Sequence, residues 1–272
     1  MRLKVYIFLI IPLLLFSCGE YEKLLKSTDY DLKIAKAKEY FEAEKYVRTT
    51  ELLDQIIPRY RATVQAEEFF WMKARSFYAM KDYYTAGADF KSYIDQYPYG
   101  KYTEEATYMA ALCDFKIAPR AELDQENTNN AIEGFNVFIT RYPYSPRVEE
   151  SKKMITELQE RLVEKSYMSA KLYYDMGQYK SSIVALTNSL KTNADSKYRE
   201  EMMYLKLNSL YLYARNSMPN KQRERYQETL DDYFSFMEEF PESKYSKEVK
   251  KIYQETSQFL KIETTEPTAN IQ

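Results

Sequence analysis

The chain has 272 residues, a formal net charge of −2, 28 Tyr and 14 Phe, but no His. Without His it lacks the usual general base near neutral pH, and two Cys are too few for a thiolate metal site. A nearly neutral chain gives no reason to expect nucleic acid as a partner. This composition disfavours most enzyme classes, and we expect a non-enzymatic protein without a metal or other cofactor.

The N-terminus has the features of a secretory signal. Arg2 and Lys4 flank an apolar run that ends at Phe16, and this run is too short to span a bilayer. Residues 1–17 are therefore predicted to be a signal peptide. The segment Leu15-Phe16-Ser17-Cys18 resembles a bacterial lipobox, which implies cleavage after Ser17 and acylation of Cys18. The alternative is an ordinary cleaved signal with an incidental Cys. By resemblance to enteric lipoprotein sorting, Gly19 favours the outer membrane, and residues 18–31 would form a lipidated tether.

The stretch from Glu67 to Pro98 predicts a helical hairpin. Apolar residues recur at helical spacing before and after a polar corner, at Phe70, Ala74, Phe77, Tyr83, Ala86, Phe90 and Tyr93. Pro98 cannot extend the second helix. Bulky and small residues alternating over about 34 residues are typical of a tetratricopeptide repeat. One such pair cannot bury its own apolar face, so neighbouring pairs must stack on it.

Related patterns before and after this stretch predict an all-α fold, a superhelical array of about five tetratricopeptide-like helix pairs. Cys113 is expected to be a small buried or half-buried residue. Insertions are expected near residues 118–130 and 216–221. The predicted organisation is pairs one to three in 32–146, a long connecting helix in 147–174, pairs four and five with a capping helix in 175–262, and a disordered tail in 263–272.

The first helix of each pair is expected to line a concave groove. Aromatic or apolar side chains alternate there with basic ones, which suits an extended segment with aromatic side chains and a terminal carboxylate. We predict that Trp71 and Arg75, one turn apart, anchor such a substrate. The alternative is that Trp71 packs between pairs while the basic residues solvate a helix face. The candidate groove residues are Ile34, Lys38, Phe41, Trp71, Arg75, Tyr78, Met109 and Lys116.

Three segments in and after the first insertion carry a family resemblance. Leu123-Asp124-Gln125-Glu126-Asn127-Thr128, then Ala131-Ile132, then Phe138-Ile139-Thr140-Arg141-Tyr142-Pro143-Tyr144-Ser145 are similar to motifs of the BamD-type outer-membrane assembly lipoproteins. The start of the mature chain, from Cys18 to Ser27, resembles the Bacteroidetes members of that family. The likeness covers roughly Cys18 to Leu260 and departs in the fifth pair, whose insertion is longer than usual.

The resemblance implies a scaffold on the periplasmic face of the outer membrane, anchored to the bilayer by acylated Cys18. In that family the C-terminal pairs dock a POTRA domain of BamA, the β-barrel insertase, and the N-terminal pairs meet unfolded β-barrel outer-membrane proteins. Two other classes stay open. One is a periplasmic tetratricopeptide-repeat adaptor lipoprotein serving other cell-envelope machinery, and the other is a carboxylate-dependent enzyme or a carbohydrate-binding lipoprotein of the outer face.

Overall fold

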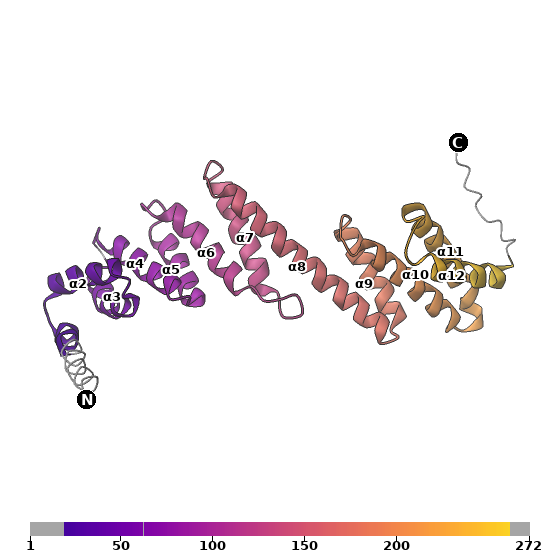
Figure 1. Ribbon diagram of the computed structural model, residues 1–272, viewed down its shortest axis with the longest axis horizontal. Helices are drawn as coiled ribbons and strands as arrows, with labels where there is room; N and C mark the ends of the chain where they lie inside the picture. The colour runs from indigo at the N-terminus through magenta and orange to yellow at the C-terminus, as the bar shows by residue number, and fades with distance from the viewer. Residues whose placement is uncertain (1–18, 62, 262–272) are drawn as a thin grey trace, which may run out of the picture. The chain divides into compact units, whose positions relative to one another are not determined.

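The computed structural model describes residues 19–61 and 63–261, in which every regular element is a helix (Figure 1). The predicted all-α array of helix pairs is confirmed. The predicted signal peptide, Cys18 and the tail from Glu263 to Gln272 lie outside the described residues. The described chain forms two compact units. The N-terminal unit contains the described residues up to Pro119 together with Gln125–Thr156. The C-terminal unit contains Arg120–Asp124 together with the described residues from Glu157 to Lys261.

The N-terminal unit holds three antiparallel helix pairs, preceded by a short helix at residues 19–26. Successive pairs pack on one another, since α3 contacts α4 and α5 contacts α6. The pairs are α2 (Tyr30–Glu42) with α3 (Tyr46–Tyr60), α4 (Ala66–Ala79) with α5 (Tyr83–Gln96), and α6 (Thr103–Ile117) with α7 (Glu126–Arg141). The first part of α8 (Val148–Asp175) completes this unit. This long helix occupies the stretch where a connecting helix was predicted.

The C-terminal unit continues from α8 into four more helices, each packed on the next. They are α9 (Tyr179–Thr192), α10 (Arg199–Arg215), α11 (Pro219–Glu239) and α12 (Ser246–Leu260). Val249, Ile252 and Leu260 on α12 are buried in the same cluster as α10 and α11 side chains. The last described helix therefore packs against α10 and α11, in the stretch where a capping helix was predicted.

The tight turns inside three of the pairs use a left-handed residue. Glu44, Lys81 and Gly177 have φ angles of 56°, 64° and 71°, and each lies two residues beyond the first helix of its pair. In the second pair, the Asp82 carboxylate then accepts a hydrogen bond from the Thr85 N–H at 3.1 Å, which caps α5. Only one of the three left-handed positions carries the glycine that this conformation favours.

Small residues permit the close packing that the repeat pattern predicts. A Cβ added at Gly134 on α7 would lie 2.9 Å from the Ala111 Cβ and 3.3 Å from its Cα on α6. The two helices therefore touch backbone to backbone at this point. Cys113 is buried as expected, and burial, with a smaller effect of Asp114, raises the pKa of its thiol to about 12.

Both insertions differ from expectation. The first is shorter because α7 begins at Glu126, where the Thr128 hydroxyl donates to Gln125 Oε1 at 2.7 Å and the Asn129 N–H to the Gln125 carbonyl at 3.0 Å. The second leaves only residues 216–218 outside helices, since Pro219 occupies the first turn of α11. The inserted residues instead lengthen α10 and α11 to 17 and 21 residues, against 14 each for α4 and α5.

Candidate protein-binding groove

The first helices share a common register that fixes which positions are equivalent. A fully buried residue marks the same place in each of them, at Ala37, Ala74, Ala111, Ala170 and Leu207. Trp71 lies three residues before Ala74, so Ile34, Tyr108, Tyr167 and Tyr204 are its counterparts. The position of Trp71 is thus occupied by an aromatic residue in every first helix except that of pair one.

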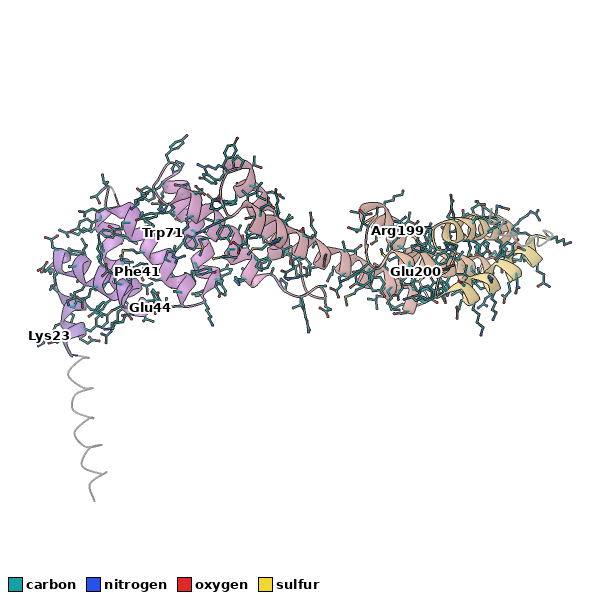
Figure 2. The ribbon with its side chains drawn as sticks, turned by 45° about the horizontal axis from the view of Figure 1, so that its top comes forward. Lys23, Phe41, Glu44, Trp71, Arg199 and Glu200 are labelled. Carbon is teal, nitrogen blue, oxygen red and sulfur yellow. The ribbon has the colours of Figure 1, made fainter. Side chains whose placement is uncertain are left out.

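Trp71 is covered by the turn that leads to the next pair. Its side chain is only 8% exposed, and its ring stacks on Tyr102 with centroids 4.7 Å apart and planes 5° apart. The same stack recurs between Tyr167 and Tyr198 at 4.5 Å and between Tyr204 and Tyr245 at 4.1 Å. Each of these turn residues directly precedes the next first helix. The contacts of Trp71, which is labelled in Figure 2, thus favour packing between pairs over an exposed binding role.

The predicted groove position in the third pair is out of register by one residue. Met109 is 3% exposed and Cys113 is fully buried, with the Cys113 Cβ 3.1 Å from a Cβ added at Gly87 on α5. The true counterparts of Trp71, Arg75 and Tyr78 are Tyr108, Leu112 and Phe115. Every residue from Ala106 to Asp114 is buried, because α6 packs between α5 and α7. A helix that is apolar on all sides shows no periodicity from which to set its register.

A ladder of ion pairs joins the first helices of consecutive pairs. Lys38 Nζ lies 2.6 Å from Glu68 Oε2, and Arg75 Nη1 lies 3.7 Å from Glu105 Oε1. Lys38 and Arg75 are equivalent positions, and so are Glu68 and Glu105. Arg147 Nη2 also reaches Glu105 Oε1, at 3.4 Å. We call these five side chains the first-helix ladder. All are between about a third and a half exposed, so each pair adds little stability but leaves its charges accessible.

The other predicted groove residues are spread from core to surface. Ile34 and Phe41 are partly buried against the core of the first pair, and the Phe41 ring meets Tyr46 edge-on at 6.0 Å. Tyr78 is partly buried against Tyr83, and burial raises its pKa. Lys116 is exposed. Of the predicted residues, the accessible polar ones are Lys38, Arg75, Tyr78 and Lys116.

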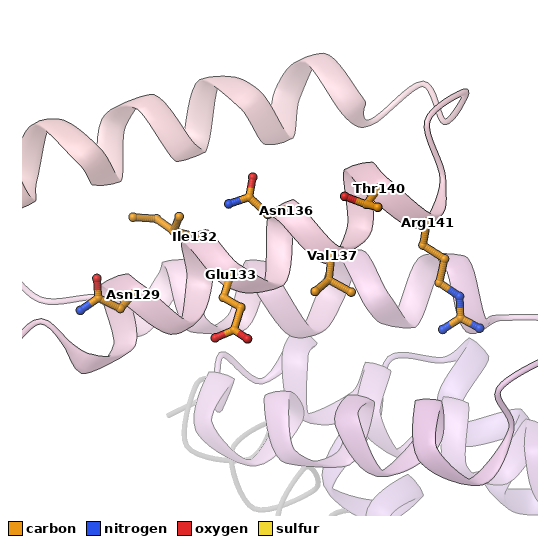
Figure 3. A pocket seen from close by; sticks show the side chains of 7 residues that line it. All are labelled: Asn129, Ile132, Glu133, Asn136, Val137, Thr140 and Arg141. Carbon is orange, nitrogen blue, oxygen red and sulfur yellow. The ribbon is translucent and has the colours of Figure 1, made fainter.

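A second surface, which the sequence did not indicate, lies along α7. It is an open hollow of about 570 Å³, lined by Asn129, Ile132, Glu133, Asn136, Val137, Thr140 and Arg141 (Figure 3). Val137 is half exposed, and Arg141 Nη2 donates to the Pro98 carbonyl at 2.6 Å. The apolar Ile132 and Val137 lie among polar and charged side chains, which suits contact with another protein rather than bond chemistry. The available signal was a pair of apolar residues, Ile132 and Val137, on an otherwise polar helix face.

Comparison with known proteins places the chain in a family. A family model described as an outer membrane lipoprotein, YfiO, matches residues 31–183, which is more than half of the chain. The chain belongs to the YfiO family of outer membrane lipoproteins. The match begins with the first helix of pair one and ends inside α9, so it includes the whole first-helix ladder. The helices α10 to α12 lie beyond it.

Among solved structures, the chain is similar to tetratricopeptide-repeat domains. The yeast Sti1 TPR2AB domain, solved as a complex with pHSP90, is 12% identical, with 84% of this chain and 98% of that chain covered and a TM-score of 0.37. The P58(IPK) TPR domain is 13% identical, with 88% and 68% covered and a TM-score of 0.41. No curated protein matches the chain. Across residues 19–61 and 63–261, no helix combines the length and apolar character that crossing a membrane requires.

Proposed function

We propose that this YfiO-family lipoprotein is a scaffold of the outer-membrane β-barrel assembly machinery, anchored through acylated Cys18 on the periplasmic face. Its N-terminal pairs would recognise unfolded barrel proteins, and its C-terminal pairs would dock a POTRA domain of BamA. The family match over residues 31–183 carries the proposal. The repeated helix pairs, a fold used to bind other polypeptides, support it.

The first-helix ladder supports recognition of a terminal carboxylate. Arg75 and Arg147 share one carboxylate, that of Glu105. An incoming carboxylate could therefore take paired hydrogen bonds from two guanidinium groups by displacing Glu105. Tyr78, one turn beyond Arg75 on α4, would offer a ring to an aromatic side chain of the same peptide. In contrast to the prediction from sequence, Trp71 would then support the wall of the proposed groove and would not touch the ligand.

Binding of a barrel-strand peptide tests this role. The probe is a labelled peptide with aromatic side chains and a free C-terminal carboxylate, followed by fluorescence anisotropy with the full chain. Arg75→Gln should weaken binding by about tenfold to a hundredfold, since hydrogen bonds between charged groups contribute roughly 1.5–3 kcal/mol. Glu105→Gln should strengthen binding because the competing carboxylate is gone. Exposed Arg223→Gln on α11 is the matched control.

Arg75→Gln and Glu105→Gln are expected to change the peptide affinity in opposite directions, and this distinguishes a binding role of the ladder from a structural one. If Glu105→Gln and Arg75→Gln weaken binding equally, the ladder supports the fold and does not exchange partners with the ligand. A peptide amide in place of the free carboxylate should bind wild-type protein as weakly as the acid binds Arg75→Gln. Equal binding of acid and amide would remove terminal carboxylate recognition.

Co-purification separates the assembly role from the alternative, a periplasmic adaptor for other envelope machinery. The tagged chain is recovered from detergent-solubilised outer membranes and its partners are identified by mass spectrometry. BamA at near-equimolar yield supports the proposal. Recovery of cell-wall or other envelope proteins without BamA favours the adaptor.

A further inference from the structure

The segment predicted to be a tether is packed onto the first helix pair. Residues 19–26 are helical, and Leu24 is 9% exposed within a cluster that includes Leu52, Leu53 and Ile56 of α3. Leu25 and Tyr21 pack against the same cluster. A flexible lipoprotein tether would have no reason to bury such side chains.

Polar contacts from both α2 and α3 hold the same helix in place. The Tyr21 hydroxyl donates to Glu51 and to the Arg48 carbonyl, while the Arg48 guanidinium lies 4.7 Å from the Tyr21 ring centroid. Lys33, 2% exposed on α2, donates to the Leu25 carbonyl at 3.0 Å and to Gln55 Oε1 at 2.6 Å. A buried ammonium is costly unless its hydrogen bonds are made, so these contacts resist release of the helix.

The docked helix begins at Gly19, the residue immediately after the predicted lipid attachment site. Consecutive Cα atoms are about 3.8 Å apart, so no flexible spacer separates the acylated residue from the fold. Acyl chains inserted in the bilayer must hold this end of the first pair at the headgroup level.

The surface at this end carries groups that match phospholipid headgroups. A hollow of about 380 Å³ lies between helix 19–26 and α2, lined by Glu20, Lys23, Leu24, Ser27, Leu32, Lys36 and Tyr40. Leu32 is 44% exposed, and Lys23, labelled in Figure 2, is exposed. Lys23 can pair with a phosphate, as can Lys36 by exchanging the exposed Glu39 carboxylate that lies 2.6 Å from its Nζ, and Glu20 can pair with an ammonium. These are the two charges of a zwitterionic headgroup.

We propose that residues 19–27 are a rigid mount, and that the surface formed by Lys23, Leu32 and Lys36 rests on the phospholipid headgroups around the anchor. The inference depends on the lipid anchor of the proposed function. It adds a fixed contact between the first helix pair and the membrane, where an acylated tether alone would leave that pair free to move. The N-terminal groove would then open at a set distance from the bilayer.

Depth-dependent fluorescence quenching tests the mount. Full-length acylated protein carrying Leu32→Cys, labelled with a fluorophore, is reconstituted into phosphatidylethanolamine–phosphatidylcholine vesicles that contain a spin-labelled lipid. Val137→Cys on α7 is the matched control, because it is a similarly exposed apolar helix residue at the other end of the same unit (Figure 1). Native Cys113 is buried and should not react. We expect quenching at Leu32→Cys at least about twice that at Val137→Cys.

A spacer variant shows whether the docked helix is the cause. Eight Gly and Ser residues inserted between Gly19 and Glu20 add a flexible reach of about 15 Å. Quenching at Leu32→Cys should then fall to the control level, while flotation with vesicles stays complete. Equal quenching at the two labels in the protein without the spacer, or quenching that the spacer leaves unchanged, would overturn the mount alone. Failure of the wild-type protein to float would overturn the lipid anchor and this inference together.

Discussion

Removal of Tyr102 should destabilise the junction between pairs two and three. The ring is partly buried and stacks on Trp71 at 4.7 Å. Losing roughly 100 Å² of aromatic burial costs about 2.5 kcal/mol, and the stack itself adds about 0.5–1.5 kcal/mol. Because area estimates of this kind are upper bounds, we expect Tyr102→Ala to lower the free energy of unfolding by about 2–4 kcal/mol.

Tyr102→Leu separates the stack from simple burial. Leucine keeps most of the apolar contact, so its cost should be about 1 kcal/mol, close to that of the stack. Urea unfolding followed by tryptophan fluorescence measures both, since Trp71 is the only Trp in the chain and lies directly under the mutated side chain. In Tyr102→Ala the native emission should also shift to longer wavelength.

Two results would refute this reasoning. If Tyr102→Ala costs less than about 0.5 kcal/mol, the stack does not hold the junction together. If Tyr102→Leu is as damaging as Tyr102→Ala, apolar contact area is not what the tyrosine contributes. The N–H of residue 102, which donates to the Tyr93 hydroxyl at 3.1 Å, is present in both variants and cannot explain a difference between them.

Three further predictions follow from local geometry. Lys81→Gly should stabilise by about 1 kcal/mol and Gly177→Ala destabilise by a similar amount in thermal unfolding, because both positions have positive φ. Gly134→Ala should cost about 1–3 kcal/mol in urea unfolding despite the better helix propensity of Ala, because its Cβ would press on Ala111; a stabilised variant would contradict the close approach. Burial raises the pKa of Asp89, with Lys73 opposing, and its Oδ2 has no hydrogen-bond partner among the described residues. The stability that Asp89 contributes below its unfolded pKa is lost as pH rises through the folded pKa, because the carboxyl must then ionise in a partly buried site. Asp89→Asn should therefore raise the urea midpoint at pH 7 but not at pH 3. An equal effect at both pH values would exclude titration as the cause.

Helix pairing could be predicted because each pair carries its own periodic signal. The spacing of Phe70, Ala74 and Phe77 places one face of α4, and Pro98 follows the end of α5 by two residues. The same reasoning placed the register of α6 one residue off, because this helix is buried on all sides and its apolar pattern does not distinguish Tyr108 from Met109. Periodicity locates a helix, but it sets a register only where one face meets water.

The contacts between pairs could not be predicted from spacing alone. Tyr102 reaches Trp71 from 31 positions away, and Lys38 reaches Glu68 from 30 away, so neither pairing is visible until the repeat is folded. The sequence left open whether Trp71 binds a substrate or packs between pairs, because nothing local indicated that a turn residue would cover it. Lys38 and Arg75 are accessible, but the carboxylates that pair with them were not foreseen.

The docked helix at residues 19–26 was missed for a different reason. Its eight residues include two Lys and two Glu and are too few for a periodic pattern to stand out. Its partners, among them Lys33 on α2 and Arg48 and Glu51 on α3, become its neighbours only after the first pair has formed. Short segments whose structure depends on tertiary contacts are where sequence periodicity carries least information.

Arg147 takes part in both kinds of contact that join successive pairs, the ring contact at the junction and the ion pairs of the first-helix ladder. Three junctions place a Tyr before the next first helix, but the junction after pair three places Arg147 there, with its guanidinium 4.6 Å from the Tyr108 ring centroid. A cation over the ring replaces the aromatic stack, and the same guanidinium reaches Glu105 in the first-helix ladder. At this junction a guanidinium therefore stands where the other three have a stacked tyrosine ring, and it places a second positive charge near the carboxylate that Arg75 contacts. Unlike a tyrosine, arginine at this junction supplies both a contact with the Tyr108 ring and a charge that pairs with Glu105.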